Sequence, residues 1–177
     1  LLFLGSGSVI IGCHHEQDMM KMGGLRKRMP VTFWTFLAGG LALSGFPLIT
    51  AGFWSKDEIL ALAYYSGVTE GNALALAVYV LLALGALLTA FYTARQICLT
   101  FLGGPRSHHA EHAHETPWTM TLPLVVLALF ALFFGFVGVP EDFPVLGPLF
   151  GGNFFHHFVG ATVGELLHHL PHPESLD

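Results

Sequence analysis

The sequence predicts an all-α membrane protein, a polytopic bundle of transmembrane helices in which one helix is broken. Of its 177 residues, 53% are hydrophobic and only 11% are charged. The mean hydropathy is +0.62. This composition excludes an ordinary soluble domain, in which about a quarter of the residues carry charge. Two apolar runs, residues 32–65 and 73–102, each exceed the roughly 20 residues that a helix needs to cross a bilayer.

Residues 1–13 predict the end of a transmembrane helix, because they are apolar and rich in small residues that let helices approach closely. The sequence opens on Leu-Leu-Phe-Leu, with no initiator Met and no charged leader. We therefore expect residues 1–177 to be a fragment of one membrane domain. Residues 14–31 are polar and predict a loop. It holds four of the seven Lys and Arg residues: Lys21, Arg26, Lys27 and Arg28.

The run 32–65 is too long for one straight helix. Its 34 residues would extend about 50 Å against a hydrocarbon core of roughly 30 Å. Gly45, Pro47 and Gly52 supply a reason to break, because proline removes a backbone donor and glycine readily leaves the helical conformation. We expect helix to resume at Ser55, since Ser-Lys-Asp-Glu fits the capping-box pattern.

Three charged residues follow Ser55 directly: Lys56, Asp57 and Glu58. In the first turn of a new helix the macrodipole would stabilise the two carboxylates and oppose a protonated lysine. Broken helices at membrane depth are a recurring form of ion site. In the alternative, residues 32–51 simply span the membrane and 55–65 form an interfacial helix whose charges lie in water. The spacing alone does not decide between them.

The second half of the chain predicts two more spans. Residues 73–102 form a transmembrane helix whose only internal charge, Arg95, is near enough to its end to reach the interface. Residues 103–117 form a histidine-rich loop, and 118–139 form the last span. Residues 140–177 predict a loop with an interfacial helix.

The distribution of positive charge predicts the orientation. If the spans alternate, loops 13–30 and 103–117 share one side and hold five Lys and Arg residues, whereas loops 66–72 and 140–177 hold none. The positive-inside rule places the first side in the cytoplasm. We therefore expect a multi-pass membrane protein with these two loops in the cytoplasm.

Two histidine clusters are candidate sites. His108, His109, His112 and His114 are dense enough for a metal, but the loop lacks thiolates and fixed ligand spacing, so we predict none. A second set lies at the cytoplasmic end of the first helix: His14, His15, Glu16 and Asp18. These groups could take up protons, and a solvated loop explains them equally well.

Other chemistries find no support in the sequence. Cys13 and Cys98 lie about 85 residues apart without the spacing of an iron-sulfur site. The net charge is −5, and no basic face with interleaved aromatic residues suggests nucleic-acid binding. We therefore expect the partners to be the lipid bilayer and other membrane proteins.

Five stretches carry a resemblance: Gly5–Ile10, His15–Asp18, Lys21–Leu25, Pro47–Leu48 and Gly52–Leu60. They resemble the L-type antiporter-like membrane subunits, also called subunit 5, of respiratory complex I, the NADH:quinone oxidoreductase. The resemblance is specific over residues 1–65, looser as far as Trp118, and slight beyond Pro140.

The resemblance implies two inverted five-helix repeats, each with a broken helix, of which this chain would supply the second break as a C-terminal-half fragment. It implies that Lys56 belongs to a proton pathway toward the periplasm, with Asp57 beside it. The chain would then be a non-redox subunit of a proton-translocating enzyme, without activity on its own. NADH, FMN, iron-sulfur clusters and quinone would bind to other subunits of the complex.

Two alternatives remain open. An A-type component of a multisubunit sodium/proton antiporter resembles the same fold and has no redox partner. In a purely structural interpretation the segment is a membrane spacer with inert charges.

Overall fold

Every regular element in the described part of the chain is helical, as the composition predicts. The computed structural model describes residues 1–47, 50–69 and 71–135, all within one compact unit, Leu1–Gly135. The predicted loop and interfacial helix of 140–177, and the end of the predicted span 118–139, lie outside these residues. The elements are α1 (Leu2–Gly12), a 3-10 turn η1 (Leu25–Lys27), α2 (Pro30–Ser44), α3 (Ala51–Tyr64), a π-helical turn η2 (Tyr65–Thr69), α4 (Ala73–Phe101), α5 (His108–Glu111) and α6 (Trp118–Phe133).

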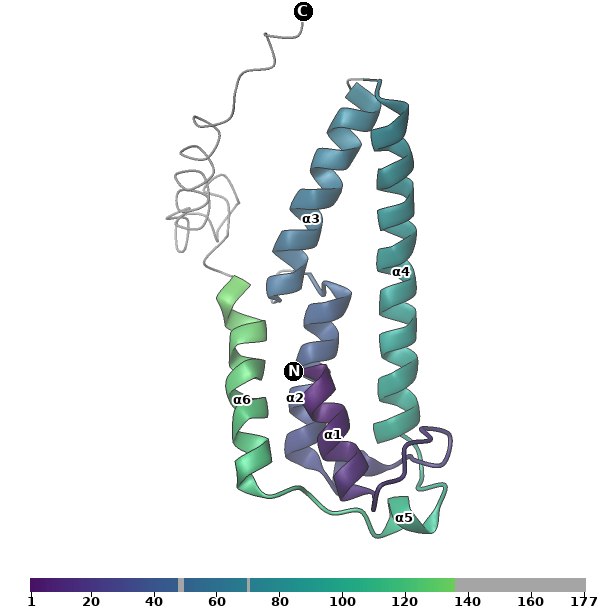
Figure 1. Cartoon of the computed structure of the whole chain (residues 1–177), viewed down its shortest axis with the longest axis vertical. Coiled ribbons are helices and arrows are strands. Elements are labelled where there is room, and N and C mark those ends of the chain that lie inside the picture. Colours follow the sequence, from purple (N-terminus) through teal and green to yellow (C-terminus); the bar gives the residue numbers. More distant parts are fainter. Residues whose placement is uncertain (48–49, 70, 136–177) are drawn as a thin grey trace, which may run out of the picture. The chain divides into compact units, whose positions relative to one another are not determined.

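Helix α2 is the central element of the unit, because α1, α3, α4 and α6 all contact it (Figure 1). Small residues allow this close packing. A Cβ atom added at Gly39 would lie 2.9 Å from Leu1 Cδ2, and one at Gly40 would lie 2.8 Å from Ile97 Cδ1. Larger residues at these positions would push the neighbouring helices away from α2.

The buried core lies toward the loop end of α2. The rings of Phe33 and Phe36 each pack against Phe101 at the end of α4, with centroids 5.4 and 5.3 Å apart. Leu25 of η1 is fully buried beside them. The predicted loop after α1 therefore contributes to the core instead of lying free in solvent.

Helix α4 alone, among the described residues, is long and apolar enough to cross a membrane unaided. Its 29 residues extend about 43 Å, more than a hydrocarbon core of roughly 30 Å. Helices α1, α2 and α6 are apolar but shorter. Large apolar side chains remain exposed along α4, including Leu81 and Leu87. An apolar surface of this extent requires lipid or further helices around it.

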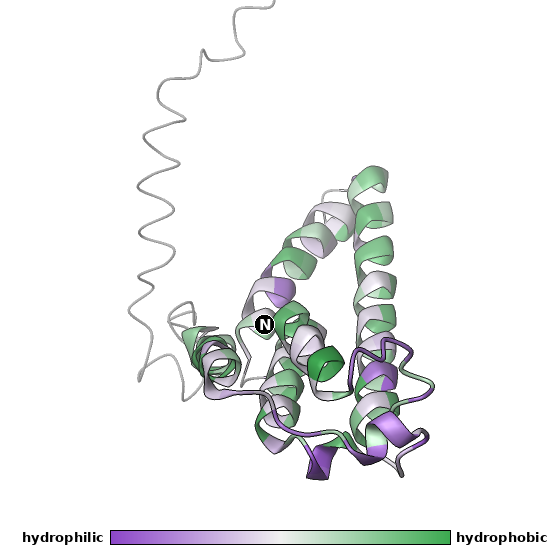
Figure 2. Cartoon of the chain, turned by 60° about the horizontal axis from the view of Figure 1, so that its bottom comes forward, coloured by the Kyte–Doolittle hydropathy of each residue, from purple (hydrophilic) through white to green (hydrophobic). Residues whose placement is uncertain are grey.

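The two loops that hold the positive charges lie at the same end of the unit, as the alternation of spans predicts. The amide of Gly24 donates to the Leu102 carbonyl at 3.1 Å, and Arg106 Nη1 donates to the Met19 carbonyl at 3.3 Å. Figure 2 shows the hydrophilic residues gathered on these loops around α5, with mainly apolar helices leading away from them.

Candidate functional site

The helix breaks after Ser44, within the segment that the sequence predicts. Gly45 has φ 72° and ψ 47°, a left-handed conformation that glycine adopts without strain. The amides of Gly45 and Phe46 donate to the Ala42 and Leu41 carbonyls, at 3.2 and 2.9 Å. This pair of bonds is a Schellman motif, which ends α2 and turns the chain out of the helical path.

The predicted capping box at Ser55 is wrong. Helix α3 begins at Ala51, so Ser55 lies inside it and donates to the Gly52 carbonyl at 3.5 Å. Gly52 accordingly belongs to the first turn of α3, whereas Gly45 and Pro47 lie before it. Thr50, the residue directly before α3, is buried, and its hydroxyl donates to the Phe46 carbonyl at 2.8 Å and does not cap α3. Nothing after Gly52 then interrupts the helix.

This correction removes the predicted electrostatic role of the α3 N-terminus. Lys56, Asp57 and Glu58 lie in the second turn of α3, and the first turn holds no acidic residue. The macrodipole acts mainly within the first turn, so it neither stabilises these carboxylates nor opposes the lysine as expected.

Lys56 instead reaches back across the break. Its Nζ donates a hydrogen bond to the carbonyl oxygen of Leu43 in the last turn of α2. The Schellman motif leaves this carbonyl without a helical amide, because its two bonds end on Ala42 and Leu41. The ammonium therefore lies at the negative end of the α2 dipole, where a cation is attracted. The hydrogen-bond partner of Lys56 is thus the C-terminal end of α2, the first half of the broken helix.

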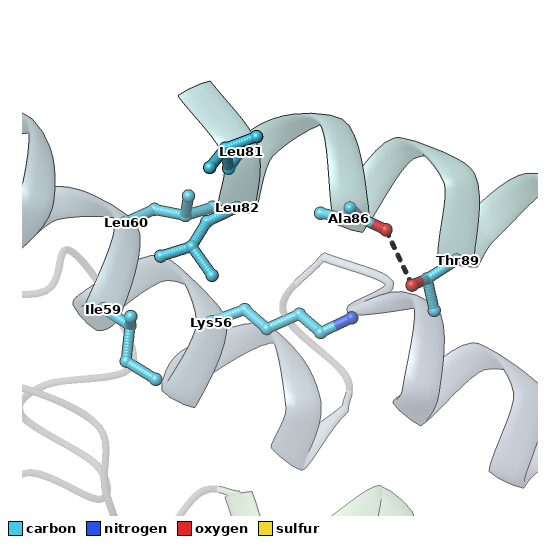
Figure 3. A pocket seen from close by; sticks show the side chains of 8 residues that line it. Lys56, Ile59, Leu60, Leu81, Leu82, Ala86 and Thr89 are labelled. Atoms are coloured by element: carbon cyan, nitrogen blue, oxygen red, sulfur yellow. Dashed lines mark hydrogen bonds between the residues drawn. The ribbon is translucent and has the colours of Figure 1, made fainter. Parts of the chain in front are cut away.

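Lys56 also lines a groove of about 290 Å³ between α3 and α4. Figure 3 shows its side chain facing α4, with Thr89 on that facing helix. The Thr89 hydroxyl donates to the Gly85 carbonyl at 2.7 Å. The other side chains that line the groove are apolar: Ile59, Leu60, Leu81, Leu82 and Ala86. Thr89 was not among the residues selected from the sequence, although a hydroxyl within the apolar run 73–102 was the available signal.

Asp57 and Glu58 do not share the environment of Lys56. Both are exposed, whereas Lys56 is half-buried. Successive residues of a helix point about 100° apart, so neighbours in sequence face different surroundings. Of the three adjacent charged residues, only Lys56 therefore lines the groove.

The predicted proton-uptake group forms a tight turn after α1. His14 and His15 are exposed and have positive φ values of 56° and 65°. Glu16 Oε1 accepts hydrogen bonds from the Gln17 and Asp18 amides, each at 3.1 Å. The Asp18 amide, acting against partial desolvation and together with Lys21, lowers the pKa of the Glu16 carboxyl. The carboxylate therefore has a structural role in holding this turn.

The histidine-rich loop contacts that turn through its rings. The ring of His14 lies 5.9 Å from that of His109 and 5.7 Å from that of His114, and His108 lies 4.4 Å from His112. Over residues 1–47, 50–69 and 71–135, no three His, Cys, Asp or Glu side chains are grouped so that they could hold a metal ion. The described geometry therefore supports ring packing between the loops.

Comparison with known proteins places this arrangement in a family context. Residues 1–83, which include α1, α2, α3 and the break, match the family model described as NADH:quinone oxidoreductase/Mrp antiporter, TM. The match therefore covers Lys56 and the carbonyl that it contacts.

Several curated relatives are similar over most of the chain. The NADH-quinone oxidoreductase subunit L of Escherichia coli (strain K12) is 48% identical over 140 residues, 79% of this chain and 21% of the relative. The subunit L of Pseudomonas aeruginosa is 44% identical over 171 residues, 96% of this chain and 25% of the relative. The NADH-ubiquinone oxidoreductase chain 5 of Dictyostelium discoideum is 45% identical over 159 residues, 88% of this chain and 23% of the relative. The chain thus spans about a quarter of the length of these relatives.

Proposed function

Because the chain belongs to the L-type antiporter-like subunits of NADH:quinone oxidoreductase, we propose that it supplies the proton-translocating break of such a subunit. The observation that carries the proposal is the contact of Lys56 with the Leu43 carbonyl across the break. It links an ionisable side chain to the end of a discontinuous helix beside a groove. This is a common design of ion sites in membrane transporters.

In the proposed mechanism Lys56 alternates between two positions. In one it is protonated and donates to the Leu43 carbonyl. In the other it turns into the groove toward Thr89, whose hydroxyl oxygen accepts its hydrogen bond directly or through water, and there it releases the proton to water in the groove. A charge at membrane depth is costly unless it is paired or hydrated, so a small change in its surroundings shifts this equilibrium. Asp57 and Glu58, exposed on other faces of α3, modulate the lysine as neighbouring charges.

We further propose that the chain is a multi-pass component of a bacterial inner membrane, with the loops at the α5 end in the cytoplasm. Its partners would be other membrane subunits of the complex, and it would have no redox centre of its own. NADH, FMN, iron-sulfur clusters and quinone would then bind to those other subunits. The bacterial subunit L relatives support this assignment.

A sodium/proton antiporter component is the less favoured function. The description of the matching family model includes both classes. The relatives quoted above bear the names of NADH-quinone or NADH-ubiquinone oxidoreductase subunits. Complex I is therefore the better-supported parent.

The test is NADH-driven acidification of inside-out vesicles that hold the assembled complex containing this chain. Lys56→Ala should lower the number of protons moved per NADH oxidised without lowering the amount of complex. Lys27→Ala is the matched control, because Lys27 is an exposed lysine of the loop before α2. An unchanged ratio in Lys56→Ala would refute the proposed role. Proton movement driven by a sodium gradient but not by NADH would favour the antiporter.

A further inference from the structure

The first turn of α2 is capped by a residue more than 80 positions away in the sequence. The residue before α2, Met29, offers no side-chain cap, and Pro30 has no backbone donor. Glu115 of the histidine-rich loop takes this role. Its Oε2 accepts hydrogen bonds from the Val31 and Thr32 amides at 2.8 and 3.3 Å. A carboxylate is well suited to this place, at the positive end of the helix dipole.

The other oxygen of Glu115 ends a chain of buried hydroxyls. Thr32 Oγ1 donates to Glu115 Oε1 at 2.6 Å. Ser8 Oγ lies 2.9 Å from Thr32 Oγ1 and 2.6 Å from Thr116 Oγ1. Ser8, Thr32 and Thr116 are all at most 5% exposed.

The direction of this chain follows from counting hydrogens. Each hydroxyl has one hydrogen to donate. That of Thr32 goes to Glu115, so Thr32 accepts from Ser8, and Ser8 in turn accepts from Thr116. Every hydroxyl thus points toward the carboxylate, an arrangement in which each bond strengthens the next. Glu115 thereby ties α1, α2 and its own loop together.

Glu115 caps the N-terminal end of α2, whereas Lys56 contacts the Leu43 carbonyl near the C-terminal end of the same helix. Helix α2 has 15 residues, about 22 Å at 1.5 Å per residue, and ends one residue after Leu43. Along its sides, Gly39 and Gly40 meet apolar side chains of α1 and α4. Such contacts hold the helix laterally and fix its axial position less firmly than hydrogen bonds do. The Glu115 cap supplies hydrogen bonds along the axis.

We propose that Glu115 is a positioning residue for proton transfer, which holds α2 by its first turn so that the Leu43 carbonyl at the other end meets Lys56. The proposal rests on the function proposed above for Lys56. It adds that the histidine-rich loop, through one carboxylate, determines the geometry of the break.

The first test measures coupling in the assembled complex. Glu115→Gln keeps the size of the side chain but removes its negative charge and one of its two acceptor oxygens, so the cap is weakened. It should lower the protons moved per NADH by about twofold or more, the size expected of a residue that acts through another. Glu115→Asp, which retains the charge, should restore part of the loss. Glu111→Gln is the matched control, because Glu111 is exposed on the same loop, and it should change nothing.

The second test asks whether the effect reaches position 56. In a Cys98→Ser background, the rate at which a small thiol reagent modifies Lys56→Cys reports the geometry of the break. Glu115→Gln should change this rate by about twofold or more, and Glu111→Gln should not. Loss of pumping with an unchanged labelling rate would show that Glu115 acts by another route, and would overturn the proposal.

The remaining outcomes are also decisive. If Glu115→Gln prevents assembly, Thr32→Val is the milder variant, because it removes one donor to Glu115 but leaves both amides in place. Thr32→Val should then reduce coupling, and Thr32→Ser should restore it. If Lys56→Ala lowers pumping but neither the Glu115 nor the Thr32 variant does, this proposal fails and the function of Lys56 stands. If Lys56→Ala has no effect, both fail.

Discussion

Gly52 of α3 packs against the carbonyl group of Ala42 in α2 so closely that a Cβ atom at position 52 would overlap the Ala42 oxygen. The obstructing atom belongs to the backbone and not to a flexible side chain. The two halves of the broken helix therefore meet at a point where only glycine fits. Gly52, expected from the sequence to break the helix, serves instead as a contact residue.

Gly52→Ala should force α3 away from α2 and so disturb the contact between Lys56 and the end of α2. Overpacking of this kind costs about 1–3 kcal/mol, so we expect reduced thermal stability of the assembled complex and fewer protons moved per NADH. Gly7→Ala in α1 is the control, because a Cβ atom there meets nothing within 4 Å. Equal coupling in the two variants would contradict this account of the break.

The sequence predicts the existence of the break better than its geometry. Gly45 and Pro47 act through local chemistry, so their effect is visible in the sequence. The start of α3 was predicted four residues late, because Ser55 fits a capping pattern, whereas the helix begins directly after the buried Thr50. A capping pattern describes local bonds and contains no information on tertiary burial.

The long-range parts of the site could not be predicted from local patterns. Lys56 was selected from the charges after the break, but its partner is a backbone carbonyl, which no residue type reveals. Glu115 acts on amides more than 80 residues earlier in the chain. Hydropathy did predict that both loops lie at one end of the bundle, which is the condition for that contact.

Gly23→Ala should separate the two loops at the α5 end. Gly23 has φ +124°, and a Cβ atom there would lie 2.5 Å from the Gly104 carbonyl oxygen. We expect faster hydrogen exchange at the Gly24 amide, whose hydrogen bond to Leu102 spans the two loops. Gly104→Ala is the matched control on the facing loop, because it has open space for a Cβ atom. Unchanged exchange in Gly23→Ala would show that the loops tolerate the separation.

Acid should loosen the turn after α1 through Glu16. Its folded-state pKa is lowered, first by the hydrogen bond from the Asp18 amide. A group of this kind stabilises the folded turn above its unfolded pKa, and the contribution is lost as pH falls through the lowered folded-state value. Protection of the Gln17 and Asp18 amides from hydrogen exchange should therefore decrease on acidification. Glu16→Gln should remove that pH dependence, and Glu111→Gln should preserve it.

The orientation of the chain can be tested at the two ends of α4. Val68, near its N-terminal end, is 51% exposed, and Glu111 lies on the exposed part of the loop that follows its C-terminal end. In a Cys98→Ser background, Cys13 remains but is fully buried, so an introduced cysteine is the reactive thiol to follow among the described residues. The positive-inside rule predicts that a membrane-impermeant thiol reagent modifies Glu111→Cys in inside-out vesicles and Val68→Cys in right-side-out vesicles. The opposite pattern would place the loops at the α5 end outside the cytoplasm and would contradict the proposed orientation. Labelling of both positions from one side would show that α4 does not span the bilayer, in spite of its length of 29 residues.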